Sequence, residues 1–482
     1  MRPDHILISV SPGETRIAYL NQGQLIGLEF ERSGRESRVG DIYLGRVEGV
    51  IHNLQAAFID IGLARSGFLA LPEARPVRTS PDERDDAIGN YVKEGDAVVV
   101  QVLRDAEEDK GPKITVRASL SGRDLVYTPG QTGVVVSRRI TDADERQRLS
   151  TVIGATAGDD GGFILRTAAQ EAEDEDLVAE TERLRDRWSA IEAAAANANA
   201  PALVYRDLDA ATRALREFGS ADLERITIDD GETMQRIRAY AEAETPDLVQ
   251  LIESHDGSEP LFDTHGVEEL IDAALSPVVG LPSGGSLIIS ETPALTAIDV
   301  NTGGAGGGGR EQTALDVNRE AAAEIAKQVR LRNISGLLVI DFIRMRRDEN
   351  RETVLSAFRR ALMGDAQQPQ VIGFTALGLV EMTRRRQGAS LSEIVCADPA
   401  DGYLKSPLTT ALEALRGVLR EAAAGAAAEF VLEVSPTVAG ALSGAASTAF
   451  EATRTRLGGG LKVAAVEGLA VDAFRVTRGG GA

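Results

Sequence analysis

Residues 293–345 read PALTAIDVNTGGAGGGGREQTALDVNREAAAEIAKQVRLRNISGLLVIDFIRM, and this stretch indicates the fold class. Two short apolar runs, 294–300 and 337–343, are rich in Val and Ile and bounded by polar residues or Gly, which predicts buried strands. Between them lie a glycine-rich loop and an amphipathic helix at 312–332. One stripe of that helix carries Leu315, Asn318, Ala322, Ile325 and Val329. Strand, crossover helix and strand predict a βαβ unit with parallel neighbouring strands.

Each apolar run carries a carboxylate where it meets polar sequence. Asp299 and Asn301 are two residues apart, so on a strand their side chains face the same way. Asp341 belongs to the second run and would lie beside Asp299 near the carboxyl edge of the sheet, where open α/β sheets place ligands. For one aspartate alone, a cap for the following turn is the simpler interpretation. The pair favours a ligand site.

The chemistry of the pair indicates which ligand. Two ionised carboxylates about 4 Å apart repel by roughly 4 kcal/mol at an effective dielectric constant near 20. A hard divalent cation removes that repulsion, and Mg²⁺ is commonly held by one or two carboxylates with water and substrate phosphate. Asp299 and Asp341, with the amide of Asn301 beside them, are therefore expected to bind Mg²⁺.

The composition is that of a soluble multidomain protein. The chain has 482 residues, of which 43% are hydrophobic and 26% charged, and this length suits about three domains. No apolar run approaches the ~18 residues of a transmembrane helix, and residues 1–20 lack the pattern of a signal peptide. A single cysteine, Cys396, excludes intrachain disulfides and a cysteine-built zinc cluster within one chain. We therefore expect a cytoplasmic protein.

The net charge of −22 argues against a general nucleic-acid coat protein such as a histone. A local basic groove remains compatible with it, because phosphate binding depends on where Lys and Arg cluster. A solvated surface is an equally good explanation of each candidate cluster. The clusters are Arg138 with Arg139, Arg344 with Arg346 and Arg347, and the run 384–386.

The N-terminal part is rich in short strands. Residues 4–30 begin a sheet that cannot close alone, and five short strands between residues 41 and 118 predict a small barrel such as the nucleic-acid-binding OB-fold. Phe58 and Phe68 lie on adjoining strands, with Lys110 on the last hairpin. Aromatic rings with nearby cations make a stacking platform for single-stranded nucleic acid. Two Phe in the barrel core are an equally good explanation.

Arg166 and Thr167 end the predicted strand FILRT in a second β-rich segment, 119–170. A guanidinium beside a hydroxyl suits a single phosphate, and a strand-end arginine in solvent is the alternative. Residues 203–280 alternate strand and helix in an α/β pattern. Residues 396–408 predict a linker, followed by a small α/β tail.

Long motifs in a fixed order carry a resemblance to a known family. They are GDIYLGRV…AAFIDIG…RSGFL, ILRTA, AIDVN…TALDVNREAAAEIAKQVRLRNISGLLVIDFI and GLVEMTRRR. On these motifs the chain resembles the ribonuclease E / ribonuclease G family of bacterial endoribonucleases. The resemblance covers residues 4 to about 476.

The resemblance implies an α/β multidomain fold in which a ribonuclease-H-like subdomain is interrupted by two insertions. The expected boundaries are 1–37 and 215–279 for that subdomain, 38–118 for an inserted OB-fold β-barrel that binds RNA, 119–214 for a 5′-monophosphate sensor domain, 280–395 for a deoxyribonuclease-I-like catalytic α/β subdomain, 396–408 for a linker that is a degenerate zinc link, and 409–482 for a small C-terminal α/β domain.

The resemblance also implies roles for residues that stand at the family's motif positions. Three groups result: Asp299 and Asp341 as Mg²⁺ ligands with Asn301 as the adjacent catalytic residue, Phe58, Phe68 and Lys110 as RNA-binding residues, and Arg166 and Thr167 as the contact to a 5′-phosphate.

Two departures from the family stand out. The family joins two of its domains through a Cys-Pro-x-Cys zinc link shared between subunits, whereas Cys396 is followed by Ala-Asp-Pro and no second cysteine. We therefore expect no zinc, and any homo-oligomer would not depend on a cysteine–zinc link. Arg344 stands where relatives usually have an acid after Asp-Phe-Ile.

The sequence thus predicts a Mg²⁺-dependent endoribonuclease that cleaves single-stranded RNA in RNA processing, including mRNA decay and rRNA processing, and is stimulated by a 5′-monophosphate. By resemblance, its products carry a 5′-phosphate and a 3′-hydroxyl. The alternative is an RNA-binding protein of the same fold with weak or lost catalysis, against which stand the intact Asp299, Asn301 and Asp341. A phosphate loop of a nucleotide hydrolase at 303–309 fails because no Gly-Lys-Ser/Thr follows.

Overall fold

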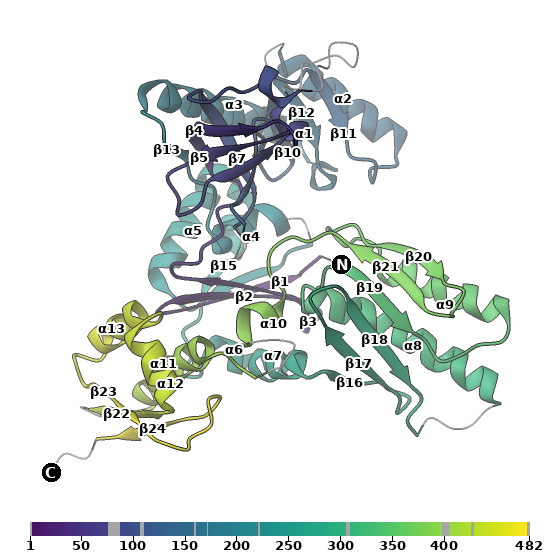
Figure 1. Cartoon of the computed structure of the whole chain (residues 1–482), viewed down its shortest axis with the longest axis vertical. Helices are drawn as coiled ribbons and strands as arrows, with labels where there is room; N and C mark the ends of the chain where they lie inside the picture. The colour runs from purple at the N-terminus through teal and green to yellow at the C-terminus, as the bar shows by residue number, and fades with distance from the viewer. Residues whose placement is uncertain are drawn as a thin grey trace. The chain divides into compact units, whose positions relative to one another are not determined.

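The computed structural model describes the chain except for residues 1, 76–86, 107–109, 159–160, 171, 220–221, 305–308, 398–403, 426–428 and 480–482. It divides into two compact units (Figure 1). One unit comprises Met1–Arg35, Ala221–Arg238 and Gln250–Ala482, and the other comprises Glu36–Ser220 and Ala239–Val249. Among the described residues, no helix combines the length and the apolar character needed to cross a membrane.

The unit that begins at Glu36 contains a closed five-stranded barrel in which each strand pairs with two neighbours. Going round, the order is β4-β5-β6-β8-β7 and back to β4, with only β6 and β8 parallel. The strands are β4 (Ile42–Ile51), β5 (Ala56–Asp60), β6 (Gly67–Ala70), β7 (Ala97–Arg104) and β8 (Lys113–Thr115), and the helix α1 (Leu71–Ala74) follows β6. Alternate residues such as Ile59, Leu69 and Val100 fill the interior. The predicted OB-like barrel is confirmed.

A second sheet in this unit has the order β11-β12-β10-β9, and α2 (Ala143–Thr156) and α3 (Asp174–Asn197) pack against it. Its strands are β9 (Leu120–Ser121), β10 (Leu125–Pro129), β11 (Gly133–Val136) and β12 (Gly161–Leu165). The sequence predicted segment 119–170 as β-rich and missed α2, because only Leu149 and Ile153 are buried along that polar helix. The strand β13 (Ala202–Tyr205) extends the barrel beside β4, and α4 (Ala210–Phe218) follows it.

The other unit contains a sheet built from two distant parts of the chain. Its order is β15-β14-β1-β2-β3, and β1 pairs in parallel with β14. The strands are β1 (His5–Ser11), β2 (Glu14–Asn21), β3 (Gln24–Arg32), β14 (Arg225–Ile228) and β15 (Ile252–Ser254), with helices α5 (Gly231–Glu244), α6 (Leu261–Thr264) and α7 (Val267–Leu275) in the same segment. Strand β1 therefore has a partner far along the chain, and the His5 ring bonds to Thr227, 222 residues later. The ribonuclease-H-like character of this part of the chain stays a prediction.

The predicted βαβ unit lies in a mixed sheet with the order β16-β17-β18-β19-β21-β20 (Figure 1). Strand β18 (Thr296–Asn301), helix α8 (Arg310–Leu331) and strand β19 (Gly336–Asp341) follow one another, and the two strands are parallel. The remaining elements are β16 (Val278–Gly280), β17 (Ser286–Glu291), α9 (Asp348–Ala361), β20 (Gln370–Phe374) and β21 (Val380–Arg384), and these strands pair antiparallel. The α/β fold class and the helix predicted at 312–332 are confirmed. The deoxyribonuclease-I-like assignment stays a prediction.

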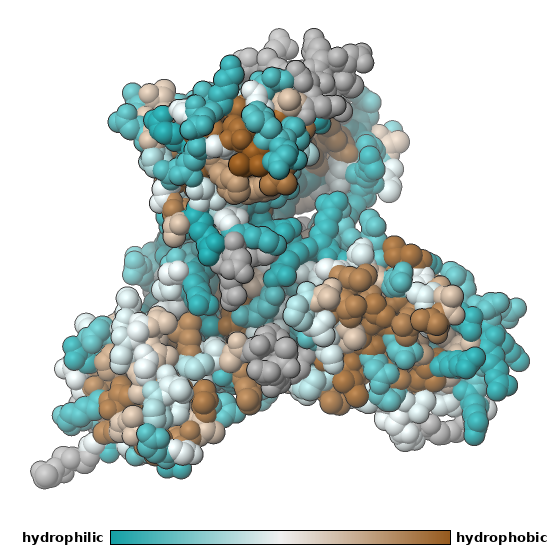
Figure 2. Space-filling model, in the orientation of Figure 1, coloured by the Kyte–Doolittle hydropathy of each residue, from teal (hydrophilic) through white to brown (hydrophobic). Residues whose placement is uncertain are grey.

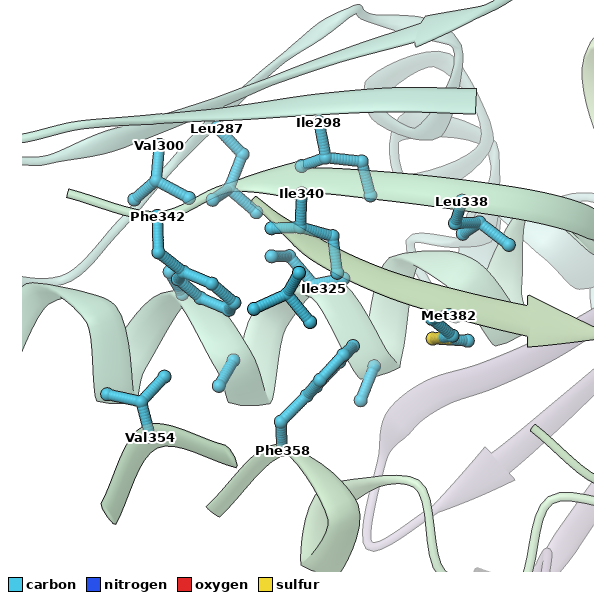
Figure 3. Packing of buried hydrophobic residues seen from close by; sticks show 14 of the residues in the cluster. Leu287, Ile298, Val300, Ile325, Leu338, Ile340, Phe342, Val354, Phe358 and Met382 are labelled. Carbon is cyan, nitrogen blue, oxygen red and sulfur yellow. The ribbon is translucent and has the colours of Figure 1, made fainter. Parts of the chain in front are cut away.

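One face of this sheet is covered and the other is open. Ile298, Ile340 and Met382 point from three strands toward α8 and α9, where Ile325 and Phe358 meet them (Figure 3). Leu, Ile and Phe packed in this way hold the sheet by removing apolar surface from water. On the other face alternate residues are exposed, and Figure 2 shows apolar side chains gathered over this part of the sheet. They include Ile288, Leu337 and Ile372.

The predicted strand ends differ from the observed ones by two residues. Residues 294–295 belong to a turn, because Thr292 and Leu295 hydrogen-bond to each other and reverse the chain. Residues 342–343 follow the end of β19, since the backbone of Ile343 bonds to the side chain of Asn318 instead of a neighbouring strand.

The C-terminal tail is the predicted small α/β domain, with β22 parallel to β23 and antiparallel to β24. Helix α10 (Leu391–Val395) precedes the tail and packs with residues of β1 and β2 such as Leu7 and Ala18. The elements of the tail are α11 (Pro407–Ala423), β22 (Phe430–Val434), α12 (Pro436–Ser443), α13 (Ser447–Arg456), β23 (Leu461–Ala465) and β24 (Phe474–Arg478). Helix α13 was not predicted. Residues 398–403 of the predicted linker at 396–408 lie outside the described residues, and Cys396 pairs with Lys405 in a short bridge. The domain boundaries stay predictions.

Candidate functional site

The carboxylates Asp299 and Asp341 occupy directly paired positions on the parallel strands β18 and β19. Both are exposed, whereas Ile298, Val300 and Ile340 beside them are buried. Since neighbours along a strand face opposite sides, the aspartates project from the open face, away from the helices. The predicted juxtaposition of these two residues is confirmed.

Asn301 fixes the orientation of one carboxylate. Its Nδ2 donates a hydrogen bond of 2.8 Å to Oδ2 of Asp299, and both side chains are exposed on the same face. This bond uses one Asn301 donor and leaves its amide oxygen and the second Asp299 oxygen on the open face. The three oxygen-bearing side chains Asp299, Asn301 and Asp341 thus lie together at one end of two strands.

Asn318, on α8, holds the chain just after Asp341. It is fully buried, its Nδ2 donates to the carbonyl oxygen of Ile343 at 2.8 Å, and its Oδ1 accepts from the Ile343 N–H at 2.9 Å. A buried amide paired on both sides is costly to disturb, because either backbone group would be left unsatisfied. The sequence placed Asn318 in the buried stripe of the helix, and an amide among apolar positions was the signal of a further role.

Glu311 holds the turn that comes next. Its carboxylate accepts backbone N–H bonds from Arg346 at 3.0 Å and Arg347 at 3.1 Å, and a bond from Asn350 Nδ2 at 2.9 Å. These bonds, led by the one from Arg347, lower the pKa of Glu311. Sequence reasoning missed this residue, which has its partners 35 residues or more away.

The aromatic pair of the barrel is formed by Phe58 on β5 and Phe68 on β6, which are directly paired positions. The ring centroids are 5.9 Å apart in an edge-to-face arrangement. Phe58 is 39% exposed and Phe68 is half-buried, so the interpretation of both as barrel core is wrong. Lys110 is exposed, while Lys113 at the start of β8 pairs with Glu73 at 3.1 Å.

Arg166 and Thr167 follow β12, where each has a polar partner. Nη1 of Arg166 donates to the carbonyl oxygen of Gly122 at 3.0 Å, and both terminal nitrogens face the carboxylate of Glu217 on α4. The Thr167 hydroxyl lies 3.1 Å from that of Ser137. Arg166 is therefore not simply a strand-end residue in solvent. In the described part of the chain, its Nε and the outer hydrogen of Nη2 have no protein partner.

Glu217 is a residue that sequence reasoning missed. It also pairs with Arg216, and Arg216 pairs with Asp207 at 2.9 Å. Burial raises the pKa of Glu217, but the Arg166 and Arg216 guanidiniums outweigh it and the net pKa is lowered. The carboxylate is therefore ionised at neutral pH and holds one edge of Arg166.

The basic run 384–386 does not form a free patch. Arg384 is buried and donates to Asp365 at 2.9 Å, and Arg386 pairs with Glu393 at 2.7 Å. The prediction that this run is either a basic groove or a solvated surface is therefore wrong for Arg384. Within the run, Arg385 is exposed and has no side-chain partner among the described residues.

Metal-binding groups are sparse in the described part of the chain, where no group of three or more His, Cys, Asp or Glu side chains could hold a metal ion. The histidines serve other contacts: His5 and His265 meet edge to face at 5.2 Å. Cys396 is buried, and burial together with the neighbouring Glu291 raises the pKa of its thiol to about 11. The pair Asp299 and Asp341 therefore remains the candidate for a cation that completes its shell with water and phosphate.

Comparisons with known proteins agree with this arrangement. Residues 119–387 match the model of the ribonuclease E/G family. Ribonuclease G of Salmonella typhimurium (strain SL1344) and of Escherichia coli (strain K12) are each 36% identical over 469 residues, covering 95% of this chain and 96% of the relative. Ribonuclease E of Nostoc sp. (strain PCC 7120) is 39% identical over 363 residues, 74% of this chain and 52% of that relative. The chain therefore belongs to the ribonuclease E/G family.

Proposed function

We propose that the protein is an endoribonuclease that cleaves single-stranded RNA and acts in RNA processing and decay. One observation carries the proposal: Asp299 and Asp341 stand side by side on an open sheet face, with Asn301 bonded to the first. Relatives named ribonuclease G align with 95% of the chain. The activity that this name states would be carried out by Asp299, Asn301 and Asp341.

The donor set fits Mg²⁺. Carboxylate and amide oxygens are hard ligands, and two carboxylates on adjoining strands repel each other unless a cation lies between them. When bound, Mg²⁺ would neutralise charge on the scissile phosphate and lower the pKa of a water molecule. Asp299 and Asp341 would hold the ion.

The other residues of the site keep this arrangement fixed. Asn301 restrains the Asp299 carboxylate through its hydrogen bond, and Asn318 restrains the backbone that leaves Asp341. A preorganised site does not have to reorient its groups during the reaction, which lowers the barrier. The open face of the sheet leaves the carboxylates accessible to an extended polymer.

RNA binding is assigned to the barrel. Phe58 presents an exposed ring with Phe68 at its edge, and Lys110 is an exposed cation on the same barrel. Unpaired bases stack on such rings whatever their sequence, whereas bases inside a duplex are already stacked. This arrangement favours single-stranded RNA as the substrate.

Stimulation by a 5′-monophosphate is assigned to Arg166 and Thr167. Gly122 and Glu217 occupy one side of the guanidinium, which leaves the Nε and Nη2 donors for a phosphate. Paired N–H donors of this kind bind phosphate in a bidentate manner. Products with a 5′-phosphate and a 3′-hydroxyl would then be better substrates for a further cut.

The test is cleavage of an unstructured 5′-monophosphorylated RNA by the wild type, Asp299→Asn and Asp341→Asn, with Mg²⁺ or with a chelator. We expect cleavage by the wild type with Mg²⁺ only, and a loss of at least ~100-fold in each variant. Asp316→Asn is the matched control, because Asp316 is an exposed acid on α8. Wild-type rates in both strand variants would refute the assignment. RNA binding without any cleavage by the wild type would favour the non-catalytic alternative.

A further inference from the structure

The turn between β19 and α9 exposes three arginines, Arg344, Arg346 and Arg347. Their guanidiniums have no carboxylate or hydrogen-bond partner among the residues that the structure describes. Arg351, one turn into α9, is different: it pairs with Asp348 at 3.3 Å. The cluster is therefore a positive patch without a salt bridge among the described residues, in a chain of net charge −22.

This turn is held in place from four directions. Asn318 bonds both backbone groups of Ile343, and Met345 is 2% exposed within the core under the sheet. Nε of Arg351 donates to the Met345 carbonyl oxygen at 3.1 Å. The Glu311 carboxylate accepts the N–H groups of residues 346 and 347.

Such anchoring has a physical consequence for binding. Ordering a loop and its side chains costs free energy on association, and a turn already fixed by its backbone avoids the larger part of that cost. All of the anchoring contacts use backbone groups or the apolar Met345, so the guanidiniums of the turn stay available. Arginines that only keep the protein soluble would not need a turn whose backbone is fixed in this way.

We propose that Arg344, Arg346 and Arg347 bind backbone phosphates of single-stranded RNA next to the phosphate that is cleaved. Arg344 lies three residues after Asp341, so the patch adjoins the carboxylate pair. Guanidinium groups match phosphate oxygens with paired N–H donors. An acidic protein also needs local positive charge where a polyanion approaches two carboxylates.

The acidic neighbours compensate the patch only in part, since Glu311 attracts Arg347 but no carboxylate pairs with the three guanidiniums in the described chain. Asp348 and Glu349 follow at once in the first turn of α9, but Asp348 is 94% exposed and is paired with Arg351. Glu311 lies beneath the turn with its oxygens committed to backbone and Asn350 donors. The turn also marks one end of the sheet: Arg384 pairs with Gly336, so the arginines at 384–386 lie at the opposite end of β19.

This inference rests on the proposed function for its choice of RNA, and its test is separate from cleavage. The test measures affinity for a fluorescent 5′-hydroxyl oligouridylate, without divalent cations, over a range of salt concentrations. Each phosphate contact on a single strand contributes roughly −0.7 to the slope of log K against log salt. We expect Arg344→Gln, Arg346→Gln and Arg347→Gln each to reduce the magnitude of that slope by about this amount.

Arg385→Gln is the matched control, since Arg385 is also exposed and without a side-chain partner in the described residues but lies at the far end of the sheet. Thermal unfolding midpoints equal to that of the wild type establish that the Gln variants are folded. Reductions confined to the turn variants support the proposal. Unchanged slopes in the turn variants, or an equal reduction in Arg385→Gln, would overturn it. Turn-dependent binding without cleavage by the wild type would reject only the proposed function.

Discussion

Glu14 and Asp341 are both carboxylates at the end of a strand, but their surroundings are opposite. Glu14 begins β2, is 3% exposed, and faces Arg32 at 2.7 Å and Arg416 at 2.7 Å. Asp341 ends β19, is exposed, and faces only Asp299 across the strand pair in the described structure. The first charge is fully compensated, and the second lies beside a like charge.

A charge that is paired inside the protein thus differs from a charge that is exposed beside a like charge. A buried carboxylate with guanidinium partners stabilises the native packing, and no ligand can reach it. Two exposed carboxylates without a cation cost free energy in the free protein, which is tolerated where binding recovers that cost. The same contrast holds between the arginines: Arg384 is buried against Asp365, whereas Arg344, Arg346 and Arg347 are exposed and have no salt bridge to any described residue.

The largest effect is expected from Glu14→Gln, which should destabilise the protein by about 3–5 kcal/mol. Arg32, Arg16 and Arg416 would then remain buried around a neutral group. Chemical denaturation measures the loss. Glu381→Gln, an exposed carboxylate of the other sheet, is the control and should have little effect. Equal stability of both variants would show that the buried charges are not structural.

Glu14 also gives a pH dependence. Burial raises its pKa, but Arg416, Arg32 and Arg16 outweigh burial, so the folded-state pKa lies below the ordinary value. The unfolded chain then binds the proton more readily, and the stability that Glu14 supplies is complete above the ordinary pKa near 4.5 and is lost as the pH falls through the folded value.

Asn318→Ala tests whether the buried Asn318 amide affects the exposed carboxylates Asp299 and Asp341. Removing the amide leaves both backbone groups of Ile343 unsatisfied, at a cost of about 1–3 kcal/mol. Because Ile343 follows Asp341 by two residues, cleavage should fall as well, and the Mg²⁺ concentration for half-maximal rate should rise. Asp316→Asn, on the exposed side of α8, controls for helix surface changes. A stability loss with an unchanged Mg²⁺ requirement would limit Asn318 to a structural role.

Phe58→Ala tests the proposed RNA-binding role of an exposed aromatic ring. Loss of base stacking should weaken RNA binding by about 1–3 kcal/mol, with little change in stability because the ring is 39% exposed. Leu54→Ala is the control, since Leu54 is 66% exposed on the same barrel and has no aromatic face. Fluorescence anisotropy with a single-stranded RNA measures both. Equal losses would indicate that apolar area, and not stacking, binds the RNA.

Glu217→Gln should reduce the preference for 5′-monophosphorylated over 5′-hydroxyl RNA by roughly threefold to tenfold, since Arg166 would keep only Gly122 as a firm partner. The ratio of kcat/KM on the two RNAs measures this preference, and the rate on 5′-hydroxyl RNA should not change. Glu145→Gln, which removes the carboxylate paired with Arg148, is the control. An unchanged ratio would show that Glu217 does not position Arg166.

The smallest effect is expected from His5. Burial, and then the neighbouring His265, lower its pKa from 6.5 to about 4. Between these values the unfolded chain binds a proton that the folded protein does not, so stability should fall as the pH drops from 6.5 toward 4. His5→Asn should remove about 1 kcal/mol or less of this fall, as His5 is only partly buried. Unfolding midpoints measured at both ends of the range test this: the wild-type midpoint should fall further than that of the variant as the pH drops.

Local sequence was sufficient for the core of the candidate site. The apolar runs rich in Val and Ile at β18 and β19 and the helical period of α8 predicted the βαβ unit, and parallel pairing then brought Asp299 beside Asp341. Local sequence failed for Arg384, because three consecutive arginines look the same whether they are solvated or one of them is buried in an ion pair. It also missed α2, which has few buried positions.

Apolar runs and helical periodicity were therefore enough to predict two strands, the crossover helix between them and the carboxylates near the strand ends. The tertiary structure decided which charges are compensated. Glu14 meets Arg416 across 402 positions, Arg166 meets Glu217 across 51, and Glu311 meets the turn of Arg346 across 35. Periodicity indicates which face of an element is buried. It does not indicate a polar partner that a distant segment contributes. Only the folded chain therefore distinguishes a charge that is paired from one that is available to a ligand.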